Sequence, residues 1–151
     1  MNMLNERVYI GIDPGASGAL AILGENRPVL VSCDYAKYDA VLGTLGAAFA
    51  TVEDVHAMPM NGCKGNFMLG WSLGRIQQML ESHGISYQLV KPQSWQKEYG
   101  ISNKDKSKAQ SIATAKRLFP GTDLRRTERC TKDHDGFADA LLIAEWGRRH
   151  A

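Results

Sequence analysis

The amino-terminal part of the chain alternates short strand-like runs with turn residues, and this arrangement constrains the fold more than any other feature. The run Arg7–Asp13 is rich in β-forming residues and stops at Pro14-Gly15. Ser17–Leu23 and Pro28–Cys33 are the next two predicted strands, with a Gly-Glu-Asn-Arg turn between them. We therefore expect three consecutive strands in an antiparallel meander.

The rest of the chain alternates helical and strand-like patterns. Further strands are predicted at Thr51–His56 and Ser86–Val90, with loops at Ala57–Asn66 and Thr122–Lys132. Predicted helices cover Tyr38–Phe49, Phe67–His83, Pro92–Tyr99, Lys104–Phe119 and His134–Arg149. This order predicts an α/β fold, a mixed sheet with helices on both faces. Because 151 residues contain no repeat or linker, we expect a single domain over residues 1–151.

The composition argues against a disordered, membrane-spanning, secreted or disulfide-bonded protein. Hydrophobic residues make up 44% of the chain and charged residues 23%, which are ordinary globular values. Its apolar runs are far shorter than the ~20 residues of a membrane span, so no membrane association is expected. The residues Met1–Arg7 lack the apolar segment of a secretion signal. Three cysteines without CxxC spacing are expected to be reduced thiols of a cytoplasmic protein.

The net charge of +2 conceals an uneven distribution. Residues 1–90 carry five Lys or Arg and eight Asp or Glu, whereas residues 91–151 carry thirteen and eight. The carboxyl-terminal part is therefore basic by five charges, which favours a phosphate-backbone partner. An ordinary solvated basic face would have the same composition.

Two acids lie at predicted strand positions where a carboxylate is unusual. Asp13 ends the first predicted strand, at the edge where open α/β sheets bind ligands. Asp-Pro-Gly is also good turn chemistry, so Asp13 can equally be a turn residue. Glu53 interrupts an apolar strand and would be costly to bury if that strand is central. On an edge strand it would face solvent, and Asp54, on the opposite face, would be the alternative.

Two further acids open the last predicted helix. Asp135 and Asp139 are four residues apart and therefore lie on one helical face. Asp135 also suits the helix dipole, which is a purely structural explanation. Asp139 lies among alanines and leucines, so we expect it to face inward.

Together the four acids predict a carboxylate cluster without zinc-type ligands. Oxygen ligands favour Mg²⁺ or Mn²⁺. Two such ions in one site can activate water and stabilise the leaving 3′-oxygen in phosphodiester hydrolysis. We therefore expect three or four of these carboxylates to form a metal site, with two ions per site.

Three motifs in order resemble the RuvC family of Holliday-junction resolvases, particularly its short phage and viral branch. They are Gly11-Ile-Asp-Pro-Gly-Ala-Ser-Gly18, Val52-Glu-Asp-Val55 and His134-Asp-Gly-Phe-Ala-Asp-Ala-Leu-Leu-Ile-Ala144, and Pro92-Gln-Ser-Trp95 fits the same spacing. The resemblance covers nearly the whole chain. It implies an RNase H-like fold with a five-stranded mixed sheet. It also implies a homodimer that cuts a four-way junction symmetrically with Mg²⁺ or Mn²⁺.

The resemblance assigns metal-binding and catalytic roles to Asp13, Glu53 and Asp139. Many family members carry an Asp or His three residues before the last acid, where this chain has Gly136. Asp135 is the preferred substitute because it shares the helical face of Asp139, and His134 is the alternative.

The family also places lysines beside the active site, a position that Lys104, Lys106 and Lys108 match. Lys108 is the preferred catalytic lysine, which would neutralise charge at the scissile phosphate. The predicted DNA-binding set is Lys64, Lys91, Lys104, Lys106, Lys108, Arg125 and Arg126.

Two apolar segments are further candidates for contacts. The loop Ala57–Asn66 follows His56 and contains Met58 and Met60, so it is either a junction-probing element or an ordinary connection. The helix Phe67–His83 is apolar on more than one side and is the predicted dimer contact. Met68 and Met79 in it can alternatively be core filler.

The leading functional hypothesis is a metal-dependent, structure-selective endonuclease acting on branched DNA. A monomeric RNase H-like nuclease for flaps or RNA is one alternative, and a non-catalytic junction-binding module is another. The chain length argues against an actin-like ATP-binding protein, because that fold needs two such domains.

Overall fold

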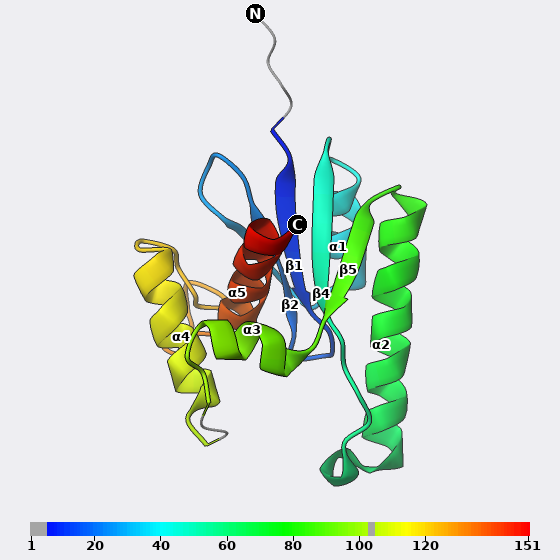
Figure 1. Cartoon of the computed structure of the whole chain (residues 1–151), viewed down its shortest axis with the longest axis vertical. Helices are drawn as coiled ribbons and strands as arrows, with labels where there is room; N and C mark the ends of the chain where they lie inside the picture. The colour runs from blue at the N-terminus through cyan, green and yellow to red at the C-terminus, as the bar shows by residue number, and fades with distance from the viewer. Residues whose placement is uncertain (1–5, 103–104) are drawn as a thin grey trace, which may run out of the picture.

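A computed structural model of the chain describes residues 6–102 and 105–151. Its five strands are β1 (Val8–Asp13), β2 (Ala19–Leu23), β3 (Val29–Ser32), β4 (Ala48–Glu53) and β5 (Ser86–Val90). Its helices are α1 (Tyr35–Leu42), α2 (Gly62–Ser82), α3 (Pro92–Glu98), α4 (Ser107–Leu118) and α5 (Asp135–His150), with a 3₁₀ turn η1 (Pro59–Asn61) before α2. Figure 1 shows how these elements surround one sheet.

The sheet is mixed, with strand order β3-β2-β1-β4-β5. The first three strands form the expected antiparallel meander, and β4 and β5 are added in parallel to β1. Because β4 lies between β1 and β5, it is a central strand and not an edge strand. Parallel pairing brings the carboxyl ends of β1 and β4 to the same edge of the sheet, so Asp13 and Glu53 end neighbouring strands.

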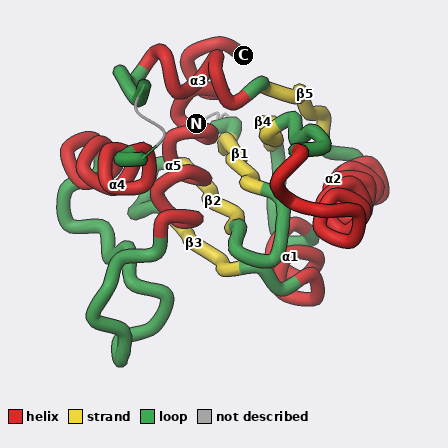
Figure 2. The backbone as a smooth tube through the Cα atoms, turned by 90° about the horizontal axis from the view of Figure 1, so that it is seen from below, coloured by secondary structure: helices red, strands yellow, loops and turns green. Residues whose placement is uncertain are grey.

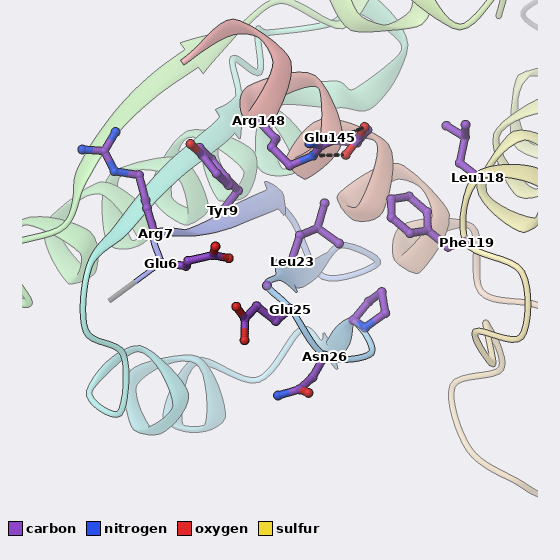
Figure 3. A pocket seen from close by; sticks show the side chains of 12 residues that line it. Glu6, Arg7, Tyr9, Leu23, Glu25, Asn26, Leu118, Phe119, Glu145 and Arg148 are labelled. Carbon is purple, nitrogen blue, oxygen red and sulfur yellow. Dashed lines mark hydrogen bonds and ion pairs between the residues drawn. The ribbon is translucent and has the colours of Figure 1, made fainter. Parts of the chain in front are cut away.

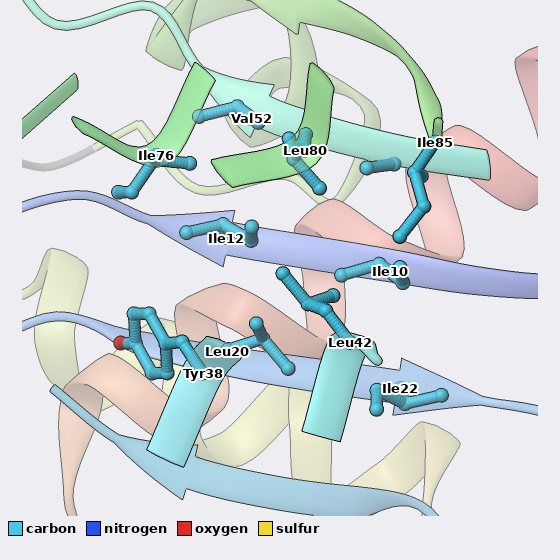
Figure 4. Packing of buried hydrophobic residues seen from close by; sticks show 11 residues of the cluster. Ile10, Ile12, Leu20, Ile22, Tyr38, Leu42, Val52, Ile76, Leu80 and Ile85 are labelled. Atoms are coloured by element: carbon cyan, nitrogen blue, oxygen red, sulfur yellow. The ribbon is translucent and has the colours of Figure 1, made fainter. Parts of the chain in front are cut away.

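Helices cover both faces of the sheet, as predicted. On one face, α1 and α2 pack on a cluster of aliphatic side chains from β1, β2 and β4, with Tyr38 and Leu42 of α1 and Ile76 and Leu80 of α2 inserted (Figure 4). On the other face α5 lies across the sheet and α4 packs beside it. Trp95 of α3 contributes to a smaller cluster with Leu142 and Ile143 of α5.

Helix α5 approaches the sheet closely because two glycines leave room for it. A Cβ atom on Gly11 would lie 2.1 Å from the Ala140 carbonyl oxygen and 2.3 Å from the Ala144 nitrogen. A Cβ on Gly147 of α5 would lie 2.1 Å from the Thr51 hydroxyl of β4. Small residues on both sides therefore set the distance between α5 and the two strands that carry the acids.

The region between β3 and β4 differs from the prediction. The helix expected over Tyr38–Phe49 begins earlier, at Tyr35, where the Asp34 side chain accepts a hydrogen bond from the Lys37 amide at 3.1 Å. It ends at Leu42, and the strand expected at Thr51–His56 begins at Ala48. The sequence Ala-Ala-Phe-Ala is helix-favouring in isolation, but here it pairs with β1, so tertiary pairing overrides local propensity.

Two other boundaries were wrong. Helix α2 begins at Gly62, so it takes up half of the loop expected at Ala57–Asn66. Its carboxyl end is as predicted, because Gly84 has a φ of 67° and its amide donates to the Glu81 carbonyl. Helix α4 begins at Ser107, later than the predicted start at Lys104, which lies outside the described residues.

Within the described part of the chain, no helix combines the length and apolar character needed to cross a membrane.

The contact between β1 and α5 predicts the effect of one substitution. Gly11→Ala should lower the free energy of unfolding by about 3 kcal/mol or more, because the added methyl overlaps backbone atoms that cannot rotate away. Gly70→Ala is the control, since no heavy atom lies within 4 Å of a Cβ at that exposed helical position. Urea unfolding measures both. Equal stabilities of the Gly11 variant and the native chain would contradict this packing.

Candidate active site at the carboxyl edge of the sheet

Two acids from neighbouring strands define the site. Asp13 ends β1 and Glu53 ends β4, and the register pairs Gly11 with Thr51 and Ile12 with Val52, so the acids lie side by side. Figure 2 views the sheet from this end, with α4 and α2 on opposite sides. Glu53, and not Asp54, is the β4 acid of this group. The Asp54 carboxylate lies 3.7 Å from His56 and its amide donates to the Val90 carbonyl.

The first turns of α5 bring the two other predicted acids to the same place. The charges of Glu53, Asp139 and Asp135, in that order, act on the Asp13 carboxylate. Asp13, Glu53, Asp135 and Asp139 all keep part of their surface exposed. Four acids from three separate elements therefore share one solvent-accessible region.

The pKa values of Asp13, Glu53 and Asp139 are raised. Burial, and then the neighbouring carboxylates, raise the pKa of Asp13 well above its ordinary value. Burial also raises the pKa of Glu53. For Asp139, burial followed by the charges of Glu53 and Asp135 raises the pKa to about 7, although Ser111 and Lys108 oppose the shift. Shifts of this kind, in which burial and neighbouring carboxylates act together, are typical of functional sites.

The departure from the family motif at Gly136 has a steric reason. A Cβ on Gly136 would lie 2.5 Å from the Ser17 carbonyl oxygen, so neither Asp nor His fits there without a backbone shift. The neighbouring His134 precedes α5, packs edge-on against Phe137 at 4.8 Å between ring centroids, and bonds the Gly18 backbone. Asp135 contributes to the carboxylate group, and His134 is not among the charges that act on Asp13.

Of the three candidate lysines, Lys108 lies at the site. Its ammonium is 3.8 Å from the Asp135 carboxylate, and its charge lowers the pKa of Asp139. The Lys108 side chain is 81% exposed. Lys106 is exposed at the start of α4, and Lys104 lies outside the described residues.

Two buried donors contact the acids and were not predicted. The indole Nε1 of Trp95 donates to Glu53 Oε2 at 2.8 Å, and Ser111 of α4 hydrogen-bonds Asp139. The sequence carries no signal for these two donors, because their contacts depend on where α3 and α4 lie relative to the acids.

The donor set fits a hard divalent cation in its chemistry. All four groups are carboxylates, and the described residues give Asp13 neither a hydrogen bond nor an ion pair that would offset its charge. Among residues 6–102 and 105–151, no three acid, imidazole or thiol groups converge closely enough to hold one ion. Side-chain rotation, including release of Asp135 from Lys108, would have to complete the cage.

The other predicted DNA-binding residues differ in whether their side chains are already bonded within the protein. Arg125 donates hydrogen bonds to Asp123 at 2.9 and 3.0 Å and lowers the pKa of that acid to about 2. The Arg125 side chain therefore stabilises its own loop. Arg126, Lys64 and Lys91 are exposed. The loop that contains Arg126 is tied to α4 by an ion pair of 2.6 Å between Lys116 and Asp133.

The apolar segments beside the site are strongly exposed. The Asn66 side chain bonds both backbone groups of Met58, at 2.9 and 3.1 Å, and holds the turn before α2. Met60 is 94% exposed and Phe67 73%. Met68 and Trp71 are each 44% exposed, whereas Met79 packs against the core and is filler.

A hollow at the opposite end of the sheet is separate from this site (Figure 3). It lies between the start of β1 and the ends of α4 and α5, and its wall includes the ion pair between Glu145 and Arg148. None of the acids predicted for catalysis lines it.

Comparisons with known proteins agree with the observed architecture. No family model matches the chain, and no curated protein matches it. Among solved structures, Thermus thermophilus RuvC in complex with a Holliday junction substrate is similar over 97% of each chain, with a TM-score of 0.65 and 17% identity. A second Thermus thermophilus RuvC structure covers 95% of this chain and 96% of that one, with a TM-score of 0.63 and 19% identity. The predicted RuvC-like, RNase H-like fold is confirmed.

The raised pKa of Asp139 predicts how stability depends on pH. The folded state binds the proton more tightly than the unfolded chain, so stability is highest below about 4 and falls as pH rises through about 7. Asp139→Asn should flatten this decline and raise the free energy of unfolding at pH 8 by about 1–4 kcal/mol.

Chemical denaturation in EDTA between pH 4 and 8 tests this prediction. Asp54→Asn, next to Glu53 but outside the carboxylate group, is the matched control and should keep the decline. An Asp139→Asn variant less stable than the native chain at pH 8 would contradict the electrostatic account.

Proposed function

We propose that this protein is a metal-dependent, structure-selective endonuclease that resolves four-way DNA junctions. The observation that carries the proposal is the meeting of Asp13, Glu53 and Asp139 at one sheet edge, with Asp135 beside them. The RuvC-like fold supports it, because one similar RuvC structure contains a Holliday junction substrate. Membership of the phage and viral branch and a cytoplasmic location remain predictions.

The carboxylates would hold Mg²⁺ or Mn²⁺, two ions in each site. When bound, such ions supply activation of water and stabilisation of charge on the leaving 3′-oxygen. The acids would supply oxygen ligands from β1, β4 and α5, and oxygen ligands favour hard cations. Lys108 would turn from Asp135 to the scissile phosphate and offset its charge.

DNA would approach the edge that holds the acids. The exposed side chains of Lys64, Lys91, Lys106, Lys108 and Arg126 are the proposed backbone contacts. The turn that contains Met60 is the proposed junction-probing element, since an exposed apolar side chain can lie against unstacked bases. Asn66 would keep that turn rigid during contact.

A homodimer would form through the exposed apolar end of α2. The buried residues of α2 are Ser72, Ile76 and Leu80, so its first turns contribute little to the core. They extend past the sheet in Figure 1 and carry Phe67, Met68 and Trp71. A second copy would cover this face and place two sites on opposed strands of a junction.

Cleavage assays test the proposed activity. We expect paired nicks on opposite strands of an immobile four-way junction with Mg²⁺ or Mn²⁺, none in EDTA, and little cutting of duplex or flap. Asp13→Asn should reduce cleavage at least 1,000-fold and leave junction binding intact, because Asp13 contributes to chemistry and not to backbone contacts.

Asp54→Asn is the matched control for this assay and should cut normally. Equal cutting of flap and duplex would replace the proposal with a general nuclease, and RNA cutting would favour an RNase H-like activity. Junction binding without any cutting would leave a binding module. Loss of junction binding in Asp13→Asn would contradict the division between chemistry and contact.

The dimer surface predicts an effect on assembly. Phe67→Glu should weaken dimerisation at least tenfold in sedimentation equilibrium, since it places a charge in an apolar contact. Val29→Glu, at an equally apolar residue that is 46% exposed on the edge strand β3, should not. A native chain that sediments as a monomer at the concentrations used for cleavage would refute the dimer.

A further inference from the structure

Glu53 is held by a side chain that has little freedom to move. The Trp95 indole is completely buried, and its Nε1 donates to Glu53 Oε2 at 2.8 Å. The indole packs in a cluster with Val90 at the end of β5 and with Leu142 and Ile143 of α5, so it links the end of β5 to α5. Its position is therefore set by the core and not by the carboxylate.

A second donor acts in the same way on Asp139. The Ser111 side chain on α4 is 2% exposed, and its hydrogen bond opposes the rise in the pKa of Asp139. Asp135, by comparison, is held by Lys108, whose side chain is 81% exposed. Glu53 and Asp139 therefore accept hydrogen bonds from buried donors, whereas Asp135 pairs with the exposed Lys108.

We propose that Trp95 and Ser111 are positioning residues, which hold Glu53 and Asp139 in the orientation that receives a divalent cation. This inference rests on the proposed function. It goes beyond it by assigning α3 and α4 a role in preparing the site, in addition to their packing on α5.

The chemistry of the donors supports this role. Trp95 and Ser111 are neutral, so they orient a carboxylate without cancelling the charge that attracts the cation. The Trp95 bond occupies Glu53 Oε2 and leaves Oε1 without a described hydrogen-bond partner. Because ligands of a metal are oriented by hydrogen bonds from outside the coordination shell, loss of either donor should cost metal affinity.

The test measures Mn²⁺ affinity directly, from the electron paramagnetic resonance signal of free Mn²⁺. Trp95→Phe keeps most of the ring and removes the donor, and Ser111→Ala removes the hydroxyl. Each should weaken Mn²⁺ binding about tenfold, within the range of 10–100-fold typical for lost outer-shell partners. Junction binding in EDTA should not change, because neither residue is exposed.

Two matched controls separate positioning from packing. Trp146→Phe makes the same substitution at a ring that packs against the same cluster and stacks on His150, and no hydrogen bond from it to an acid of the site is seen among the described residues. Thr114→Ala removes a buried hydroxyl one turn along α4 that donates to the Gln110 carbonyl at 2.8 Å. Both should bind Mn²⁺ as the native chain does.

The possible results distinguish the inference from the proposed function. Native Mn²⁺ affinity in Trp95→Phe and Ser111→Ala would overturn the inference alone. Equal losses in the control variants, or a parallel loss of junction binding, would also overturn it, because they indicate general loosening. A native chain that binds no Mn²⁺ and cuts no junction would overturn the proposed function, and the inference with it.

Discussion

The close packing of α5 on β1 and β4 determines where every acid of the site lies. Gly11 and Gly147 remove the side chains that would keep the helix at an ordinary distance, and Ala140 and Ala144 complete the contact. Because α5 rests directly on the strands, Asp139 reaches the edge at which Asp13 and Glu53 end. A larger residue at either glycine would lift the helix and separate acids that come from distant parts of the chain.

This packing also explains the electrostatic character of the site. Burial beneath this packing raises the pKa values of Asp13, Glu53 and Asp139, and the neighbouring carboxylates add to the rise at Asp13 and Asp139. The arrangement of the acids therefore lowers the free energy of unfolding, and a bound divalent cation would offset this loss. The donors from α3 and α4 are neutral, and the Lys108 side chain that pairs with Asp135 is exposed, so these contacts leave most of the negative charge in place.

The sequence predicted the elements that carry strong local signals and missed those decided by tertiary contacts. Strand β5 was predicted correctly because Lys91-Pro92 ends it, and the carboxyl end of α2 was predicted correctly because Gly84 follows it. The start of β4 was wrong, since its alanine-rich sequence becomes a strand only by pairing with β1. The carboxylate grouping followed from strand ends and helical spacing. The donors Trp95 and Ser111 could not be predicted, because their contacts depend on how α3 and α4 cross the sheet edge.

The most direct test of the central claim is the anomalous diffraction of Mn²⁺ in crystals of the protein. The account predicts a peak between the carboxylate oxygens of Asp13, Glu53 and Asp139, with Asp135 turned away from Lys108 to join them. A peak at another place, or no peak at Mn²⁺ concentrations that support cleavage in solution, would contradict the claim that this sheet edge is the metal centre.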